Sequence, residues 1–67
     1  MLFRSNNVLT VKGDNIVKVA IFNALGQEVV AVENRNEIDV TSLNNGLYFV
    51  RVTDVNGNVS VNKIVKE

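Results

Sequence analysis

Apolar and polar residues alternate along most of this chain with a period of two, the spacing of an extended strand with one buried face. The pattern is clearest over residues 47–53, where Tyr48, Val50 and Val52 share one face. Arg51 falls on the opposite face. We predict that the face with Tyr48 points into a hydrophobic core.

Further runs of this kind predict short strands joined by turns. Together with residues 47–53, the predicted strands are residues 8–12, 16–23, 27–32, 37–41 and 59–66. Gly13-Asp14-Asn15 predicts a hairpin turn after the first strand. Gly26 suits a left-handed turn position, and we expect the strands on either side of it to pair. Asn56-Gly57, between two alternating runs, predicts another hairpin.

The last strand leaves two interpretations open, because its apolar residues do not keep one parity. Val59 and Val61 share a face, whereas Ile64 has the opposite parity. A β-bulge near Asn62 or Lys63 would reconcile them. Alternatively, this is an edge strand that need not alternate strictly, with lysines that protect its exposed edge from aggregation.

Leu43, Gly46 and Tyr48 match the tyrosine corner of Greek-key sandwiches, in which a tyrosine at the start of a strand bonds its hydroxyl to upstream backbone. Such a bond satisfies an otherwise buried phenol. We expect Leu43 to act as an apolar plug beneath this corner.

The composition agrees with an all-β fold. The chain has 67 residues, with fourteen Val, eleven Asn and four Gly, and it lacks Pro, Cys, Trp and His. Valine favours strands, and Asn and Gly favour turns. Because an immunoglobulin-like sandwich has about 100 residues, we predict one small immunoglobulin-like antiparallel β-sandwich of about six strands, lacking its first strand.

Charge and residue types exclude several functions. Seven basic residues balance seven acidic ones without clustering, which argues against a nucleic-acid surface. Without Cys or His there is no thiolate nucleophile, no usual zinc site and no imidazole base. The glycines are scattered singly, so no phosphate-binding loop is present. We therefore predict no enzyme, no metal, no cofactor and no small-molecule substrate.

Residues 1–5 do not continue the pattern that follows them. A reverse translation of this segment contains the end of a common sequencing-adapter oligonucleotide. We expect residues 1–5 to be a non-native or disordered leader and residues 6–67 to be the domain, which would have lost its upstream part.

The turns and strands also form an ordered series of motifs. These are Val19-x-Ile21-Phe22-Asn23-x-x-Gly26-Gln27-x-Val29, Ile38-Asp39-Val40-x-x-Leu43-x-x-Gly46-x-Tyr48-Phe49-Val50-x-Val52, Asn56-Gly57 and Lys63-Ile64-Val65-Lys66. The series resembles the C-terminal sorting domain of the type IX secretion system. Asn44 stands where that family often has Pro, and the usual Tyr-Pro-Asn-Pro-like opening segment is missing.

The resemblance implies a secretion signal at the end of a larger protein of Bacteroidetes-type bacteria. In that family a translocon recognises the domain and carries the cargo across the outer membrane. A surface sorting peptidase then removes the domain and joins the cargo to a surface lipopolysaccharide. A signal peptide would lie upstream, and the cargo would be secreted or displayed on the cell surface. The recognition candidates are Gly46, Tyr48, Lys63 and Lys66.

Each candidate also has a purely structural interpretation. Gly46 and Tyr48 can simply hold the corner, and Lys63 and Lys66 can be solvated lysines of an edge strand. The alternative functions are a generic sandwich module for adhesion or carbohydrate binding, and a structural spacer. Because a small sandwich that lacks a strand leaves an open edge, we also predict a homodimer or a strand-swapped assembly.

Overall fold

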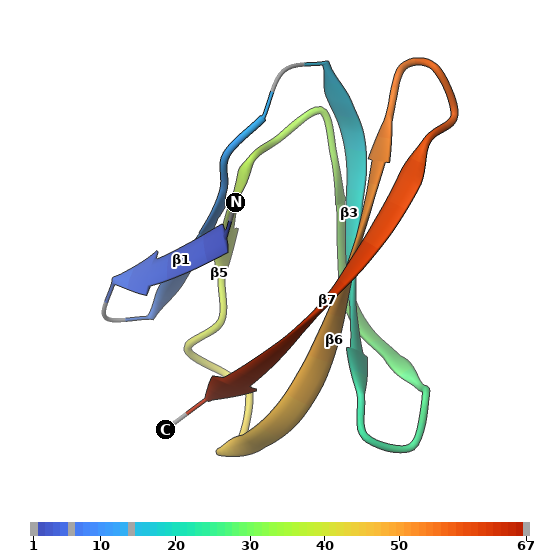
Figure 1. Ribbon diagram of the computed structural model, residues 1–67. Helices are drawn as coiled ribbons and strands as arrows, with labels where there is room; N and C mark the ends of the chain where they lie inside the picture. Colours follow the sequence, from blue (N-terminus) through green and yellow to red (C-terminus); the bar gives the residue numbers. More distant parts are fainter. Residues whose placement is uncertain (1, 6, 14, 67) are drawn as a thin grey trace.

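The computed structural model describes residues 2–5, 7–13 and 15–66, and these residues form an antiparallel β-sandwich (Figure 1). The strands are β1 (Leu2–Ser5), β2 (Val8–Val11), β3 (Ile16–Asn23), β4 (Glu28–Glu33), β5 (Glu37–Asp39), β6 (Gly46–Asp54) and β7 (Val59–Lys66). Within the described ranges, no helix is long and apolar enough to cross a membrane.

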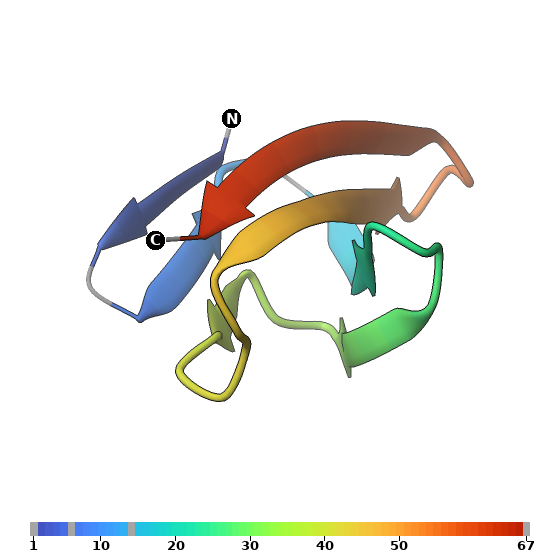
Figure 2. The same ribbon diagram turned by 90° about the horizontal axis from the view of Figure 1, so that it is seen from below.

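The strands form two layers. A three-stranded sheet has the order β1-β2-β5, and a four-stranded sheet has the order β4-β3-β6-β7. The view from below shows the two sheets facing each other (Figure 2). This arrangement confirms the predicted small all-β sandwich.

The predicted strands agree closely with the observed ones, and β3 and β7 have the predicted bounds. The residues that the structure describes form seven strands instead of about six. The additional strand is β1, which pairs antiparallel with β2 in the segment that we expected to be a leader.

The hairpin predicted at Gly13-Asp14-Asn15 is wrong. β2 and β3 belong to different sheets, so this segment crosses from one layer to the other. Asp14 itself lies outside the described residues. The physical reason is that β3 already pairs with β4 on one side and with β6 on the other, which leaves β2 no edge to join.

The hydrophobic core lies between the two sheets. Tyr48 and Val50 of β6 are buried, and Val52 packs against them, as the alternating pattern predicts. The remaining buried members of this core are Leu9, Val11, Val19, Ile21, Ile38 and Val40. These buried side chains lie on β2, β3, β5 and β6, except for Val40, which follows directly after β5.

The last strand is an edge strand with an unbroken register. Eight consecutive residue pairs join β7 to β6, from Gly46 with Lys66 to Thr53 with Val59. This continuity excludes the bulge interpretation and favours the edge-strand one. Ile64 packs against the core, whereas Val59 and Val61 are 56% and 59% exposed. The face of β7 that carries these valines therefore points away from the core, and Ile64 lies on the opposite face.

Candidate recognition site

The loop between β5 and β6 contains the predicted tyrosine corner. The Tyr48 hydroxyl donates a hydrogen bond of 2.7 Å to the backbone carbonyl of Asn44. The side chain is only 7% exposed and belongs to the core. Leu43 packs against the core as the expected plug. Tyr48 thus joins the loop to the packed interior through one directional bond.

A second strand holds the same loop. The Lys66 ammonium at the end of β7 donates a hydrogen bond of 2.8 Å to the backbone carbonyl of Leu43. Lys66 is 8% exposed, which is unusual for a lysine and requires a bonded partner. It lies beside Gly46 in the ladder between β6 and β7. The carbonyls of Leu43 and Asn44 are therefore bound from β7 and β6 respectively.

Gly46 closes this corner by its backbone. Its φ of +148° lies in a region that L residues with a side chain rarely adopt, although a Cβ would meet no atom within 4 Å. Glycine is thus required by backbone conformation and not by space. Upstream, the Leu43 amide donates to the Val40 carbonyl at 3.1 Å, which tightens the start of the loop.

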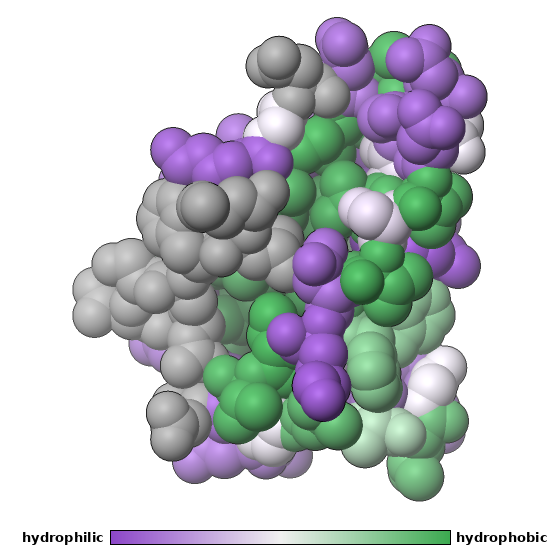
Figure 3. Space-filling model, in the orientation of Figure 1, coloured by the Kyte–Doolittle hydropathy of each residue, from purple (hydrophilic) through white to green (hydrophobic). Residues whose placement is uncertain are grey.

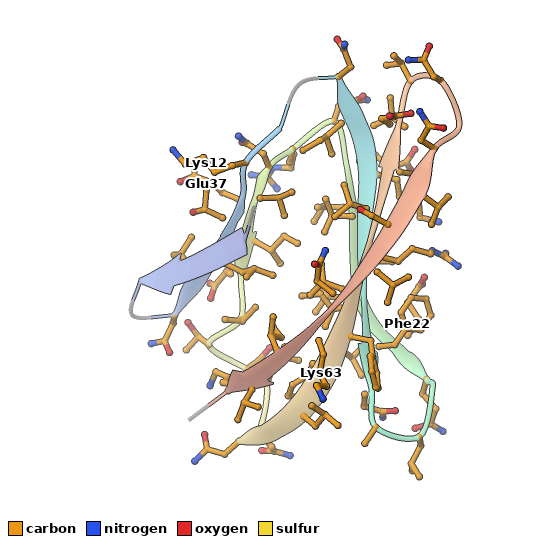
Figure 4. The ribbon with its side chains drawn as sticks, in the orientation of Figure 1. Lys12, Phe22, Glu37 and Lys63 are labelled. Carbon is orange, nitrogen blue, oxygen red and sulfur yellow. The ribbon has the colours of Figure 1, made fainter. Side chains whose placement is uncertain are left out.

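The structure separates the two lysines of the C-terminal motif. Lys63 is exposed and pairs in register with Phe49. Because residues three apart in a strand point to opposite faces, Lys63 lies on the outer face and Lys66 on the core face. Figure 4 shows Lys63 and Phe22 on the four-stranded sheet, apart from Glu37 on the other sheet and Lys12 just after β2. The corner thus collects Leu43, Gly46, Tyr48 and Lys66, but not Lys63.

A scan against protein families matches residues 5–67 to the secretion system C-terminal sorting domain. The chain belongs to this family. A search of curated proteins and a search of solved structures give no significant match.

The sorting-domain family supplies the general function. The domain is a sorting signal of type IX secretion, and it implies a secreted or cell-surface cargo and contact with the secretion machinery. Sorting domains of this kind are not known as catalysts. Among the described residues, no cluster of three or more His, Cys, Asp or Glu could hold a metal ion.

The β3–β4 hairpin and the β6–β7 hairpin of this sorting domain have loops of the same backbone conformation at glycine and the same capping hydrogen bonds. Gly26 and Gly57 have φ of +85° and +83°, and their amides donate to the carbonyls of Asn23 and Asp54. The side-chain Oδ1 of Asn23 accepts hydrogen bonds from the backbone amides of Leu25 and Gln27. In the same way, Oδ1 of Asp54 accepts hydrogen bonds from the backbone amides of Asn56 and Asn58. The two glycines and Asn56 thus have the turn positions that the sequence predicts.

Sequence reasoning missed the two residues that cap these loops, Asn23 and Asp54. The repeated spacing of an Asx residue three positions before Gly could have revealed them. The hydrogen bond from the Asn58 amide, which is the largest cause, holds the pKa of the Asp54 carboxyl below its ordinary value. Hydrogen bonds from the Thr41 hydroxyl and amide lower the pKa of Asp39 in the same way.

The sequence also did not predict the contacts on the outer face of the four-stranded sheet. The Arg51 guanidinium lies 5.0 Å from the centre of the Phe22 ring, within the range of a cation–π contact. Phe22 of β3 is paired in register with Phe49 of β6, and Phe49 is paired in turn with Lys63 of β7.

A separate open hollow of about 320 Å³, lined by Ile16 and Val52 among others, lies at the far end of β6 from the corner.

Proposed function

We propose that this domain is the terminal address of a larger cargo protein, which it directs across the outer membrane through the type IX translocon. The family match over residues 5–67 carries this proposal. A surface sorting peptidase would then release the domain from the cargo. The doubly bound corner supports the same function, since it presents one fixed loop conformation to a receptor.

The buried and the exposed recognition candidates would act in different ways. Tyr48 and Lys66 have almost no exposed surface, and their polar atoms are bound to the loop backbone. They would therefore affect recognition by holding the loop of residues 43–46. Lys63 is exposed and is free to face an acidic surface of the translocon.

The proposal is tested by reporter fusions in a type IX-competent bacterium. A reporter carrying residues 1–67 at its C-terminus should appear on the cell surface or in the medium. The same domain placed in the middle of the reporter should leave it in the periplasm, because an address must be terminal. Periplasmic retention of both fusions would contradict the function. A parallel fusion of residues 6–67 tests whether the sorting domain needs residues 1–5.

A second experiment separates recognition from folding. Tyr48→Phe removes the hydroxyl and leaves the Asn44 carbonyl without its partner. We expect a loss of about 1 kcal/mol in the free energy of unfolding, measured by urea denaturation. If export of the reporter persists while stability falls, Tyr48 serves the fold alone. If export fails at a temperature where the variant is folded, the corner is read by the translocon.

Self-association is a further property that we propose for this domain. A single core of this size supplies about 3–5 kcal/mol, and an open edge rich in valine favours association. A homodimer or a strand-swapped assembly in concentrated solution would show as a doubled mass in light scattering. A monomer at all concentrations would contradict it.

A further inference from the structure

The two edges of the four-stranded sheet differ in their readiness to accept another strand. β4 has a register shift beside Phe22 and carries Glu28 and Glu33, both exposed. Bulges and charges of this kind disfavour edge-to-edge pairing. β7 is regular over eight residues, and Val59, Val61 and Val65 are each more than half exposed. Figure 3 shows hydrophobic side chains beside hydrophilic ones on the face that β7 crosses.

The backbone of β7 can be assigned group by group. The Asp54 amide donates to the Asn58 carbonyl at 3.0 Å, so these residues form a hydrogen-bonded pair at the start of the ladder. Hydrogen-bonded and non-hydrogen-bonded pairs alternate in an antiparallel ladder. The amides and carbonyls of Ser60, Asn62 and Ile64 therefore point toward β6. Those of the intervening residues, which include the three exposed valines, point toward the open edge.

We propose that two copies of this domain pair through β7, antiparallel, about a two-fold axis at Asn62. Val59 then faces Val65 of the partner subunit, and Val61 faces Lys63 of the partner subunit. The outward-pointing backbone groups of the two strands meet as hydrogen-bonded pairs. The two four-stranded sheets become one continuous sheet, with the exposed valines of both copies gathered on one face.

Neighbouring registers are less suitable. An axis at Lys63 places two lysines directly opposite each other, which is destabilising. An axis at Val61 places Val65 against Gly57 of the partner subunit, outside the strand. The register about Asn62 pairs all residues from 59 to 65 and keeps the lysines apart. This self-complementarity is the reason to choose a second copy as the occupant.

The proposed pair is small and closed. A single strand-to-strand contact buries less than the ~1,200–2,000 Å² of a stable interface, so association should be weak and should appear at high concentration. Each copy has one β7 edge, and its β4 edge is bulged and charged. Assembly through this interface therefore stops at two copies. The inference deepens the self-association proposed above and does not depend on export.

Cysteine cross-linking tests the register, because the chain contains no native Cys. Asn62→Cys places two thiols in a non-hydrogen-bonded pair, where Cα atoms lie about 4.5 Å apart and a disulfide fits. Ser60→Cys is the matched control on the same face of β7. In the proposed dimer, the Cα atoms of position 60 in the two copies are separated by roughly 14 Å along the strands. Under mild oxidation at high concentration, we expect a covalent dimer from Asn62→Cys and a monomer from Ser60→Cys.

Charge variants test the same contact without a cross-link. Val61→Lys is at an exposed position and sets a lysine against Lys63 of the partner subunit twice in each dimer. In the Asn62→Cys background it should slow cross-linking roughly tenfold. Val29→Lys, on the opposite edge of the sheet, should leave the rate unchanged. Equal cross-linking of both cysteine variants would overturn the proposal, as would a purely monomeric protein. A dimer in light scattering without the Asn62→Cys link would overturn this interface and favour a strand swap.

Discussion

The two hairpins of the four-stranded sheet are built on the same loop but use their last strand in opposite ways. In β4, Val30 and Val32 point inward and pack against the core. In β7, the exposed valines point outward, and the core side holds Ile64 and Lys66. Since the backbone hydrogen bonds and the Oδ1 caps of the two loops match, these shared bonds do not determine which side of the strand is apolar.

The comparison distinguishes valines that stabilise the fold of one copy from valines that are available to bind a partner. The inward valines of β4 are explained by burial, which stabilises the fold in proportion to the apolar area removed from water. The outward valines of β7 are each more than half exposed and gain much less from the fold of a single copy. An exposed apolar row on a regular edge is instead typical of a surface that binds another strand or partner.

The largest expected difference in the free energy of unfolding is between substitutions of one valine from each hairpin. Val32→Asp places a carboxylate against Val19, which is fully buried. We expect a loss of at least about 3 kcal/mol, enough to unfold most of a domain of this size. Val61→Asp, at an exposed site, should change the free energy of unfolding by less than about 0.5 kcal/mol. Urea denaturation of the two variants checks the difference, and equal losses would contradict the outward orientation of β7.

The lysines of β7 should differ by a smaller amount. Lys66→Met keeps a long apolar chain but leaves the Leu43 carbonyl without its donor, which should cost about 1–2 kcal/mol. Lys63→Met is the matched control on the exposed face and should be nearly neutral. The denaturation midpoints of the two variants measure the difference. Equal midpoints would mean that the Lys66 bond does not stabilise the corner.

The glycines of the two loops should behave alike. Gly26→Ala and Gly57→Ala each force an L side chain into a left-handed conformation, at a cost of about 1–2 kcal/mol. Neither added Cβ would meet an atom within 4 Å, so strain in the backbone is the whole cost. Thermal unfolding of the two variants should give equal shifts within error. A clearly unequal pair would show that the loops differ in a way that their hydrogen bonds do not reveal.

The sequence predicted most of the fold because the inner strands follow simple alternation. The inward face of β6, the pairing of β3 with β4 and the tyrosine bond were all foreseen from spacing. The crossing from β2 to β3 was not, since Gly-Asp-Asn marks a turn but does not say which strand comes next to which. The orientation of β7 was ambiguous because an edge strand can expose its apolar side. A buried Lys66 could not be foreseen, since its partner is a backbone carbonyl 23 residues away.

The smallest effect concerns acid, to which the two loops should respond differently. The β6–β7 loop is capped by Asp54, whose pKa is lowered by the Asn58 amide, whereas Asn23 caps the other loop and does not titrate. A lowered pKa in the folded state means that the unfolded chain binds more protons. The contribution of Asp54 is therefore present above the ordinary carboxyl pKa and is lost as the pH falls through the folded value.

Exchanging the two caps tests this difference. Asp54→Asn should flatten the fall in melting temperature between about pH 5 and about pH 2, and Asn23→Asp should steepen it. Asp39 also has a lowered pKa and remains in both variants, so some acid sensitivity should persist in Asp54→Asn. Both changes keep the Oδ1 acceptor that caps the loop. Asp54→Asn should lower the melting temperature slightly near pH 7, where the ionised carboxylate contributes, and should approach that of the original chain at low pH. An unchanged acid profile in Asp54→Asn would show that this carboxylate does not couple to folding.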